Sequence, residues 1–169
     1  LFIPMQNFSP KQRYEEDLAK PGFQPDIAQA QAVNELQSLY DRLIEREAKQ
    51  RGVTARLRRM FSEKNTPEQG LYFWGGVGRG KTYLVDVFYE SLPFEAKLRV
   101  HFHRFMQRVH KELTLLAGEK NPLEQVAAGI AAETRVICFD EFFVSDIADA
   151  MILAGLMTAL FQRGVTLVA

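Results

Sequence analysis

The feature that most constrains this chain is a glycine-rich octapeptide made up of Gly75, Gly76, Val77, Gly78, Arg79, Gly80, Lys81 and Thr82. It matches the pattern G-x-x-x-x-G-K-[ST], in which backbone amides surround a phosphate chain. Glycine is needed because a side chain would block close approach of the backbone and because the loop uses positive φ. The lysine supplies a charge for the β- and γ-phosphates, and the threonine hydroxyl is placed to bind Mg²⁺. The motif predicts a nucleotide-binding chain.

The flanks of the octapeptide support this interpretation. An apolar, aromatic stretch at 71–74 predicts a buried strand before it, and residues 80–91 show helical periodicity until Pro93 ends the run. Strand, glycine loop and helix together present backbone N–H groups and a helix N-terminus to a polyphosphate. The alternative is a glycine-rich turn that matches by chance, and the Lys-Thr pair with these flanks argues against it.

A second motif is an apolar strand, 135–139, that ends in Asp140 and Glu141. In a parallel sheet the strand C-termini share one edge, so we expect Asp140 beside the phosphate loop. There it can hold Mg²⁺ through a water ligand, and Glu141 can polarise the attacking water as a general base. The alternative is an ordinary strand followed by a solvated acidic turn. The acidic pair favours hydrolysis over transfer to a bound acceptor, and no N-K-x-D guanine-reading motif occurs.

Strands and helices are predicted to alternate through the second part of the chain. We expect strands near 71–74, 98–102, 135–139 and 165–169, and helices near 80–91, 103–117, 122–132 and 146–162. Asn121 and Asp146 are predicted helix N-caps. This alternation predicts an α/β fold of the P-loop NTPase kind, a mainly parallel sheet between two layers of helices.

The first part of the chain is predicted to be helical. Ser9 and Gln12 form a capping box with Pro10 at the first helical position, and Asp26 opens a longer helix. The apolar stripe of that second helix consists of Ile27, Ala30, Val33, Leu36, Leu39, Tyr40, Leu43 and Ile44. We therefore divide the chain into an N-terminal helical element (1–52), a linker (53–70) and an ATPase core (71–169).

Bulk properties limit the classes of partner and location. The net charge is zero, so no global field indicates nucleic acid or a membrane surface as a partner. The single cysteine, Cys138, falls in a predicted core strand and fits a reducing compartment. No apolar run is long enough to span a membrane. The last strand, 165–169, ends the chain, which we interpret as a portion of a longer protein.

Three segments resemble one family. They are Gly70–Thr82, His101–Met106 and Cys138–Met151, and together they are similar to the ZapE family of bacterial cell-division ATPases, also called AFG-one-like after mitochondrial relatives. The resemblance runs from about Gln24 to the last residue.

The resemblance implies an AAA+-type P-loop ATPase with sheet order 5-1-4-3-2, whose strand 5, sensor residue and lid helices are absent from this chain. It implies ATP or ADP and Mg²⁺ as cofactors, Lys81 and Glu141 as catalytic residues, and Thr82 and Asp140 at the metal. It further implies the tubulin-like division protein FtsZ as partner, a homo-oligomer, and a cytoplasmic protein recruited peripherally to the inner membrane at the division site. The fragment alone is expected to bind nucleotide and to turn it over poorly. The alternative is a helicase-loader-like or quality-control ATPase acting on nucleic acid or client proteins.

Weaker signals leave alternatives open. His101 and His103 are predicted on one strand face, either near the Asp140 edge or, with His110, as a metal site. A group of basic residues could form a patch that binds single-stranded nucleic acid, or it could be an ordinary solvated surface. This candidate basic patch consists of Arg56, Arg58, Arg59, Arg104, Arg108, His110 and Lys111. Phe142 and Phe143 either bury under the next helix or contact a neighbouring subunit, and we favour burial for one of them.

Overall fold

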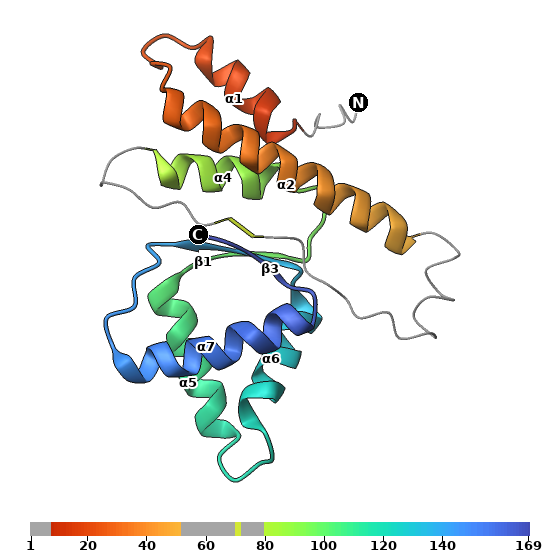
Figure 1. Ribbon diagram of the computed structural model, residues 1–169, viewed down its shortest axis with the longest axis vertical. Coiled ribbons are helices and arrows are strands. Elements are labelled where there is room, and N and C mark those ends of the chain that lie inside the picture. Colours follow the sequence, from red (N-terminus) through yellow and green to blue (C-terminus); the bar gives the residue numbers. More distant parts are fainter. Residues whose placement is uncertain (1–7, 52–69, 72–79) are drawn as a thin grey trace, which may run out of the picture.

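Figure 1 shows a computed structural model of the chain, which describes residues 8–51, 70–71 and 80–169. Its centre is a parallel sheet of β1 (Lys97–His101), β2 (Val136–Asp140) and β3 (Thr166–Val168), in the order β1-β2-β3. Leu71 continues the sheet beyond β3 through a parallel bridge to Val168. Its amide donates to Leu167 O at 3.0 Å, and its carbonyl accepts from the Ala169 amide at 2.9 Å. The order Leu71, β3, β2, β1 is the order 1-4-3-2 within the predicted sheet order 5-1-4-3-2.

Helices cover both faces of this sheet (Figure 1). One layer holds α1 (Pro10–Leu18), α2 (Ile27–Arg51) and α4 (Lys81–Ser91). The other holds α5 (Phe102–Leu115), α6 (Pro122–Glu133) and α7 (Ile147–Gln162). The predicted αβα sandwich with a parallel sheet is therefore confirmed.

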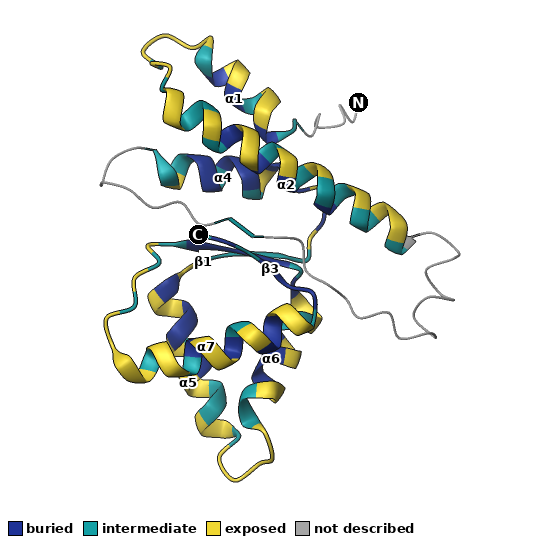
Figure 2. Ribbon diagram, in the orientation of Figure 1, coloured by how far each residue is buried: buried dark blue, intermediate teal, exposed yellow. Residues whose placement is uncertain are grey.

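The alternation of side chains along β2 divides the core into two clusters. Val136 and Cys138 point to the layer that contains α4, whereas Ile137 and Phe139 point to the layer that contains α5. All of these side chains are fully or almost fully buried, as expected for a central parallel strand. Figure 2 shows the burial concentrated where the helices face the sheet.

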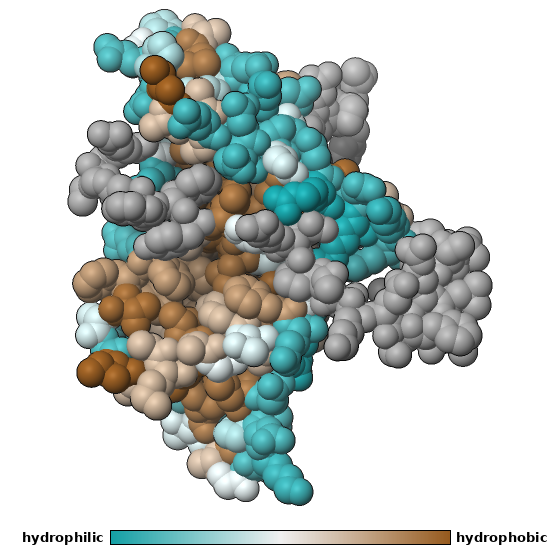
Figure 3. Space-filling model, viewed as in Figure 1, coloured by the Kyte–Doolittle hydropathy of each residue, from teal (hydrophilic) through white to brown (hydrophobic). Residues whose placement is uncertain are grey.

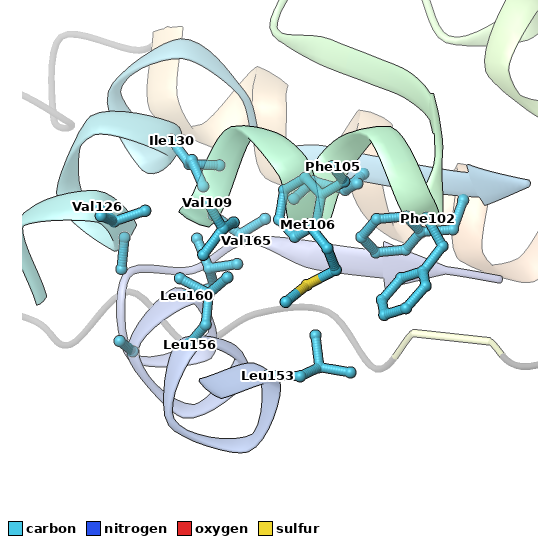
Figure 4. Packing of buried hydrophobic residues seen from close by; sticks show 14 residues of the cluster. Phe102, Phe105, Met106, Val109, Val126, Ile130, Leu153, Leu156, Leu160 and Val165 are labelled. Atoms are coloured by element: carbon cyan, nitrogen blue, oxygen red, sulfur yellow. The ribbon is translucent and has the colours of Figure 1, made fainter. Parts of the chain in front are cut away.

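Figure 4 shows the cluster on the α5 side of the sheet. Phe102, Phe105 and Met106 of α5 project toward Leu153 and its neighbours on α7 (Figure 4). The rings of Phe102 and Phe105 meet Phe139 edge-on, with centroids 5.9 and 5.0 Å apart. Edge-to-face packing adds about 0.5–1.5 kcal/mol per pair to the burial itself. Helix α5 is thereby fixed under the carboxyl end of the sheet.

Helices α1 and α2 share their buried cluster with α4 and the other face of the sheet. The predicted capping box is present, because Ser9 Oγ accepts from the Gln12 amide while Gln12 Oε1 accepts from the Ser9 amide. Asp26 accepts from the Ala28 amide at the start of α2, as predicted for a cap. Ile27 was expected in the apolar stripe, but it is 81% exposed because the contact with α4 begins further along α2. The predicted linker, 53–70, lies outside the described residues except for Gly70.

The junction between β1 and α5 differs from its prediction. The strand ends at His101 and the helix begins at Phe102 with no connecting loop. Phe102 is 4% exposed and packs against Phe139 from the first turn of the helix. His103 is therefore on the helix, and the prediction that it shares a strand face with His101 is wrong.

Asn121 precedes α6 in the left-handed region (φ 49°) and its side chain makes no capping bond, whereas Asp146 caps α7 through the Ala148 amide.

Candidate nucleotide-binding site

The central contact of the candidate site joins the end of the glycine motif to the end of β2. Thr82 lies in the first turn of α4, and its hydroxyl donates to Asp140 Oδ1 at 3.4 Å across 58 sequence positions. The sheet brings them together because β2 ends at Asp140 at the edge where α4 begins. Thr82 and Asp140, the two residues that the sequence assigns to Mg²⁺, thus lie together as expected from the parallel topology.

The phosphate loop itself is described only at its end. Residues 75–79 lie outside the described residues, and Gly80, Lys81 and Thr82 lead into α4. Gly80 has φ +69°, and a Cβ atom there would lie 2.5 Å from Gln29 Nε2. The positive φ favours glycine at this position, whereas the Gln29 side chain could move aside for an added Cβ atom. Helix α4 directs its N-terminus, with Lys81 in its first turn, toward the site.

Asp140 is approached by Arg99, which the sequence analysis did not connect to it, and by His101, which it did. Arg99 on β1 places Nη2 3.4 Å from Asp140 Oδ1 and donates from Nε to Asp86 Oδ1 on α4 at 2.8 Å. His101, paired with Asp140 in the strand register, places Nδ1 3.7 Å from Oδ2. The expectation that His101 lies near the Asp140 edge is thus confirmed for this histidine. His103 instead contacts Gln107 on its own helix.

Arg99 carried a weak signal in the sequence. Lys97, Arg99 and His101 alternate with the apolar Leu98 and Val100 along β1, which indicates one polar strand face. The pattern could have shown that Arg99 points away from the α5 layer. It could not have shown the two carboxylates that Arg99 meets, because Asp86 belongs to a helix on the same side of the sheet.

Glu141 follows directly after the strand and is exposed. Its φ is +48°, in the left-handed region that residues other than glycine seldom occupy. Such a conformation costs on the order of 1 kcal/mol, and side chains held this way are often functional. Asp140 is half-buried whereas Glu141 is exposed, so the two adjacent acids have different surroundings.

The donor set suits a hard divalent cation that is held mostly by a polyphosphate. The Thr82 hydroxyl and the Asp140 carboxylate are oxygen ligands, which Mg²⁺ prefers, and they already lie within hydrogen-bond distance of each other. Within the described ranges no cluster of three His, Cys, Asp or Glu side chains could form a closed metal cage. The alternative of a histidine metal site finds no support there.

The aromatic pair after Glu141 separates into one packed and one exposed ring. Phe142 lies against Phe102 and Phe139, with centroids 4.7 and 5.5 Å apart, whereas Phe143 is 76% exposed. The expected packing of one of the pair is therefore borne out in part, because Phe142 is half-buried and its ring partners lie on α5 and β2. Ile147 and Met151, one and two turns on, are also exposed. Figure 3 shows apolar side chains gathered over the lower half of the molecule, where α5 and α7 lie in Figure 1.

Two members of the candidate basic patch, Arg108 and His110, contact carboxylates. Arg108 donates to Glu112 and to Glu133, each at 2.9 Å. Its pKa is raised by the hydrogen bond to Glu112 and, further, by Glu133. His110 Nε2 lies 2.5 Å from Asp149 Oδ1 on α7. These pairings leave less positive charge for a nucleic-acid backbone, while the three arginines at 56, 58 and 59 lie outside the described residues.

Comparison with known families identifies the chain. The family model described as AFG1-like ATPase matches residues 8–169. The chain belongs to the AFG1-like ATPase family. The resemblance to the ZapE family inferred from the three motifs is thereby confirmed.

Relatives of this AFG1-like ATPase occur in bacteria and eukaryotes. Cell division protein ZapE of Escherichia coli is 53% identical over 98% of this chain and 46% of its own length. Lactation elevated protein 1 homolog B of Danio rerio is 46% identical over 64% of this chain and 24% of its own. An uncharacterised protein of Schizosaccharomyces pombe is 41% identical over 66% of this chain and 28% of its own length. The chain thus spans about half the length of the ZapE relatives.

No solved structure matches the chain significantly. In the part of the chain that the structure describes, no helix has the length and apolar character needed to cross a membrane.

Proposed function

We propose that this chain binds MgATP and, within the whole protein, hydrolyses ATP. The observation that carries the proposal is the contact of Thr82 with Asp140, which brings the end of the glycine motif to the acidic strand end. Membership of the AFG1-like ATPase family supports it independently.

In the proposed mechanism each residue has one role. Lys81 and the amides of residues 75–82 bind the phosphates, and Thr82 and Asp140 hold Mg²⁺, with Asp140 acting through a water. Bound Mg²⁺ supplies charge neutralisation on the phosphate oxygens. Glu141 orients a water and accepts its proton as the water oxygen attacks the γ-phosphorus. The bond from that phosphorus to the bridging oxygen breaks, and ADP leaves with the electron pair.

Calorimetry with two variants tests these roles. Lys81→Ala is expected to abolish ATP binding, because a charge and its phosphate contacts are lost together. Glu141→Gln is expected to retain ATP binding but to lose hydrolysis in the full-length protein. Lys111→Ala, an exposed lysine on α5, is the matched control. Undiminished ATP affinity in Lys81→Ala would contradict the assignment.

For the partner we propose the tubulin-like division protein FtsZ, engaged by a cytoplasmic protein that associates peripherally with the inner membrane at the division site. The Escherichia coli relative is a cell division protein by name, which supports this proposal. The nucleic-acid alternative is weakened by the carboxylate pairing of Arg108 and the contact of His110 with Asp149.

Two binding measurements distinguish the partners. Co-sedimentation of the full-length Glu141→Gln protein with FtsZ polymers in ATP should exceed that of Lys81→Ala. Affinity for single-stranded DNA should be weak near physiological salt. A sub-micromolar affinity with a steep negative dependence on salt would instead favour the loader-like ATPase.

A further inference from the structure

We infer that Arg99 is a positioning residue for Asp140, and through it for the divalent cation; the inference rests on the proposed MgATP site. Arg99 links three elements. It leaves the middle of β1, contacts Asp86 on α4 through Nε at 2.8 Å, and reaches Asp140 at the end of β2 through Nη2 at 3.4 Å. A planar guanidinium with donors in fixed directions can span two carboxylates in this way.

Burial makes this arrangement restrictive. The Arg99 side chain is 17% exposed and Asp140 is 21% exposed, so neither group can turn freely into water. The third nitrogen, Nη1, is buried, and no hydrogen-bond partner is recorded for it among the described residues. The guanidinium is held by its two carboxylate partners, and removal of either one would leave it with a single anionic partner.

The same oxygen of Asp140 is fixed from two sides. Arg99 Nη2 and the Thr82 hydroxyl both approach Oδ1 at 3.4 Å. Thr82 and Asp86 are four residues apart on α4 and so lie on one helix face. Helix α4 therefore fixes the orientation of the Asp140 carboxylate directly through Thr82 and indirectly through Asp86 and Arg99.

Two physical effects of Arg99 have opposite signs, which makes the inference testable. As a charge alone, the guanidinium repels Mg²⁺, so its removal would tighten cation binding. As a positioning group, it holds the carboxylate in one orientation, so its removal would weaken cation binding. Groups that orient metal ligands are worth about 10–100-fold in metal affinity, and we expect the positioning effect to be larger.

The experiment compares ADP affinity with Mg²⁺ and with EDTA, by calorimetry, in the full-length protein. Arg99→Met keeps the apolar stem and removes the donors. Its ADP affinity in EDTA should stay within about twofold of wild type, and its affinity in Mg²⁺ should fall by about tenfold or more. Arg104→Met, an exposed arginine on α5, is the matched control and should match wild type in both.

Two further variants separate placement from charge and protect the test against misfolding. Arg99→Lys keeps the charge but lacks the planar guanidinium and its several donors. It should therefore show most of the loss of ADP affinity in Mg²⁺. Asp86→Asn leaves Arg99 and Asp140 intact but removes the anchor on α4, and should lose Mg²⁺ dependence in part. Unchanged or tighter Mg²⁺-dependent binding in Arg99→Met, or full recovery with lysine, would overturn the inference. If wild type itself binds ADP no better with Mg²⁺, the proposed function fails instead.

Discussion

The Tyr83 hydroxyl donates a hydrogen bond to the Asp17 carboxylate, which joins α1 to the first turn of α4. Tyr83 comes directly after Thr82, so α1 is fastened one residue away from the candidate metal site. Asp17 is 5% exposed and is also paired with Lys20 at 2.6 Å and with Arg13 at 3.5 Å. The N-terminal helices are thereby held on the nucleotide core by a buried polar contact as well as by apolar packing.

Replacement of Tyr83 by phenylalanine should destabilise the fold. The ring and its contact with Phe23 are kept, but a nearly buried carboxylate loses its hydroxyl donor. A loss of this kind costs about 1–3 kcal/mol. Urea denaturation should therefore show a lower free energy of unfolding for Tyr83→Phe. In the control, Tyr40→Phe, no hydroxyl bond is recorded among the described residues, and the change should be smaller. Equal losses in the two variants would contradict the prediction.

Acidification should remove the contribution of Asp17 to the stability of the fold. Burial raises its pKa, but the hydrogen bonds from Lys20 and Tyr83 together with the nearby charges outweigh burial, and the net pKa lies below its usual 3.8. A folded-state pKa below the unfolded value gives stability that is present above the unfolded pKa and is lost as pH falls through the folded pKa.

Unfolding free energies between about pH 6 and about pH 2 test this directly. Wild type should lose stability on acidification more steeply than Asp17→Asn, which has no carboxylate to protonate at this position. Parallel curves for the two proteins would show that Asp17 does not contribute to the acid dependence.

The meeting of Thr82 with Asp140 was predictable, because it follows from two rules that need no side-chain detail. The octapeptide requires a strand before it and a helix after it, and parallel strands end at a common edge. An apolar strand ending in an aspartate then reaches that edge wherever it lies in the sheet order. The αβα layers, the strand positions and most helix ends followed from the same periodicities.

The contacts of Arg99 and Tyr83 were not predictable from local pattern. Each depends on which helix covers which part of the sheet: Asp86 meets Arg99 only because α4 lies over β1 and β2, and Asp17 meets Tyr83 only because α1 crosses α4. The start of α5 at Phe102 was missed because Phe102 faces the same layer as Leu98 and Val100 whether it ends the strand or begins the helix. The apolar pattern alone therefore does not fix this boundary.

Two helical glycines should respond differently to alanine. Gly129 lies on α6 with no atom near the position of an added Cβ, so Gly129→Ala should raise the free energy of unfolding by about 0.5–1 kcal/mol through helix propensity. At Gly155 on α7 the new Cβ would lie 2.7 Å from Leu123 Cδ2. Gly155→Ala must displace that side chain and should gain less or lose stability. Thermal denaturation of both variants decides, and a larger gain at Gly155 would contradict the packing of α6 on α7.

Cys138 should be chemically silent in the folded protein. It is the only cysteine, it is fully buried in β2, and burial raises the pKa of its thiol to about 12. Because the thiolate is the reactive form, modification at neutral pH requires the strand to open.

A thiol-reactive reagent should therefore modify native Cys138 at least about a thousandfold more slowly than the denatured chain, since domains of this kind are stable by about 5–15 kcal/mol. A cysteine introduced by Lys111→Cys on the exposed face of α5 should react at the rate of the denatured chain and serves as the control.

Because β2 ends at Asp140, a nucleotide that binds only the folded state should slow the modification of Cys138 further, in proportion to the ligand concentration over its Kd. Protection by MgADP that is absent in Lys81→Ala would connect the stability of the central strand to the phosphate loop. Rapid labelling of the native chain would instead show that β2 opens without global unfolding.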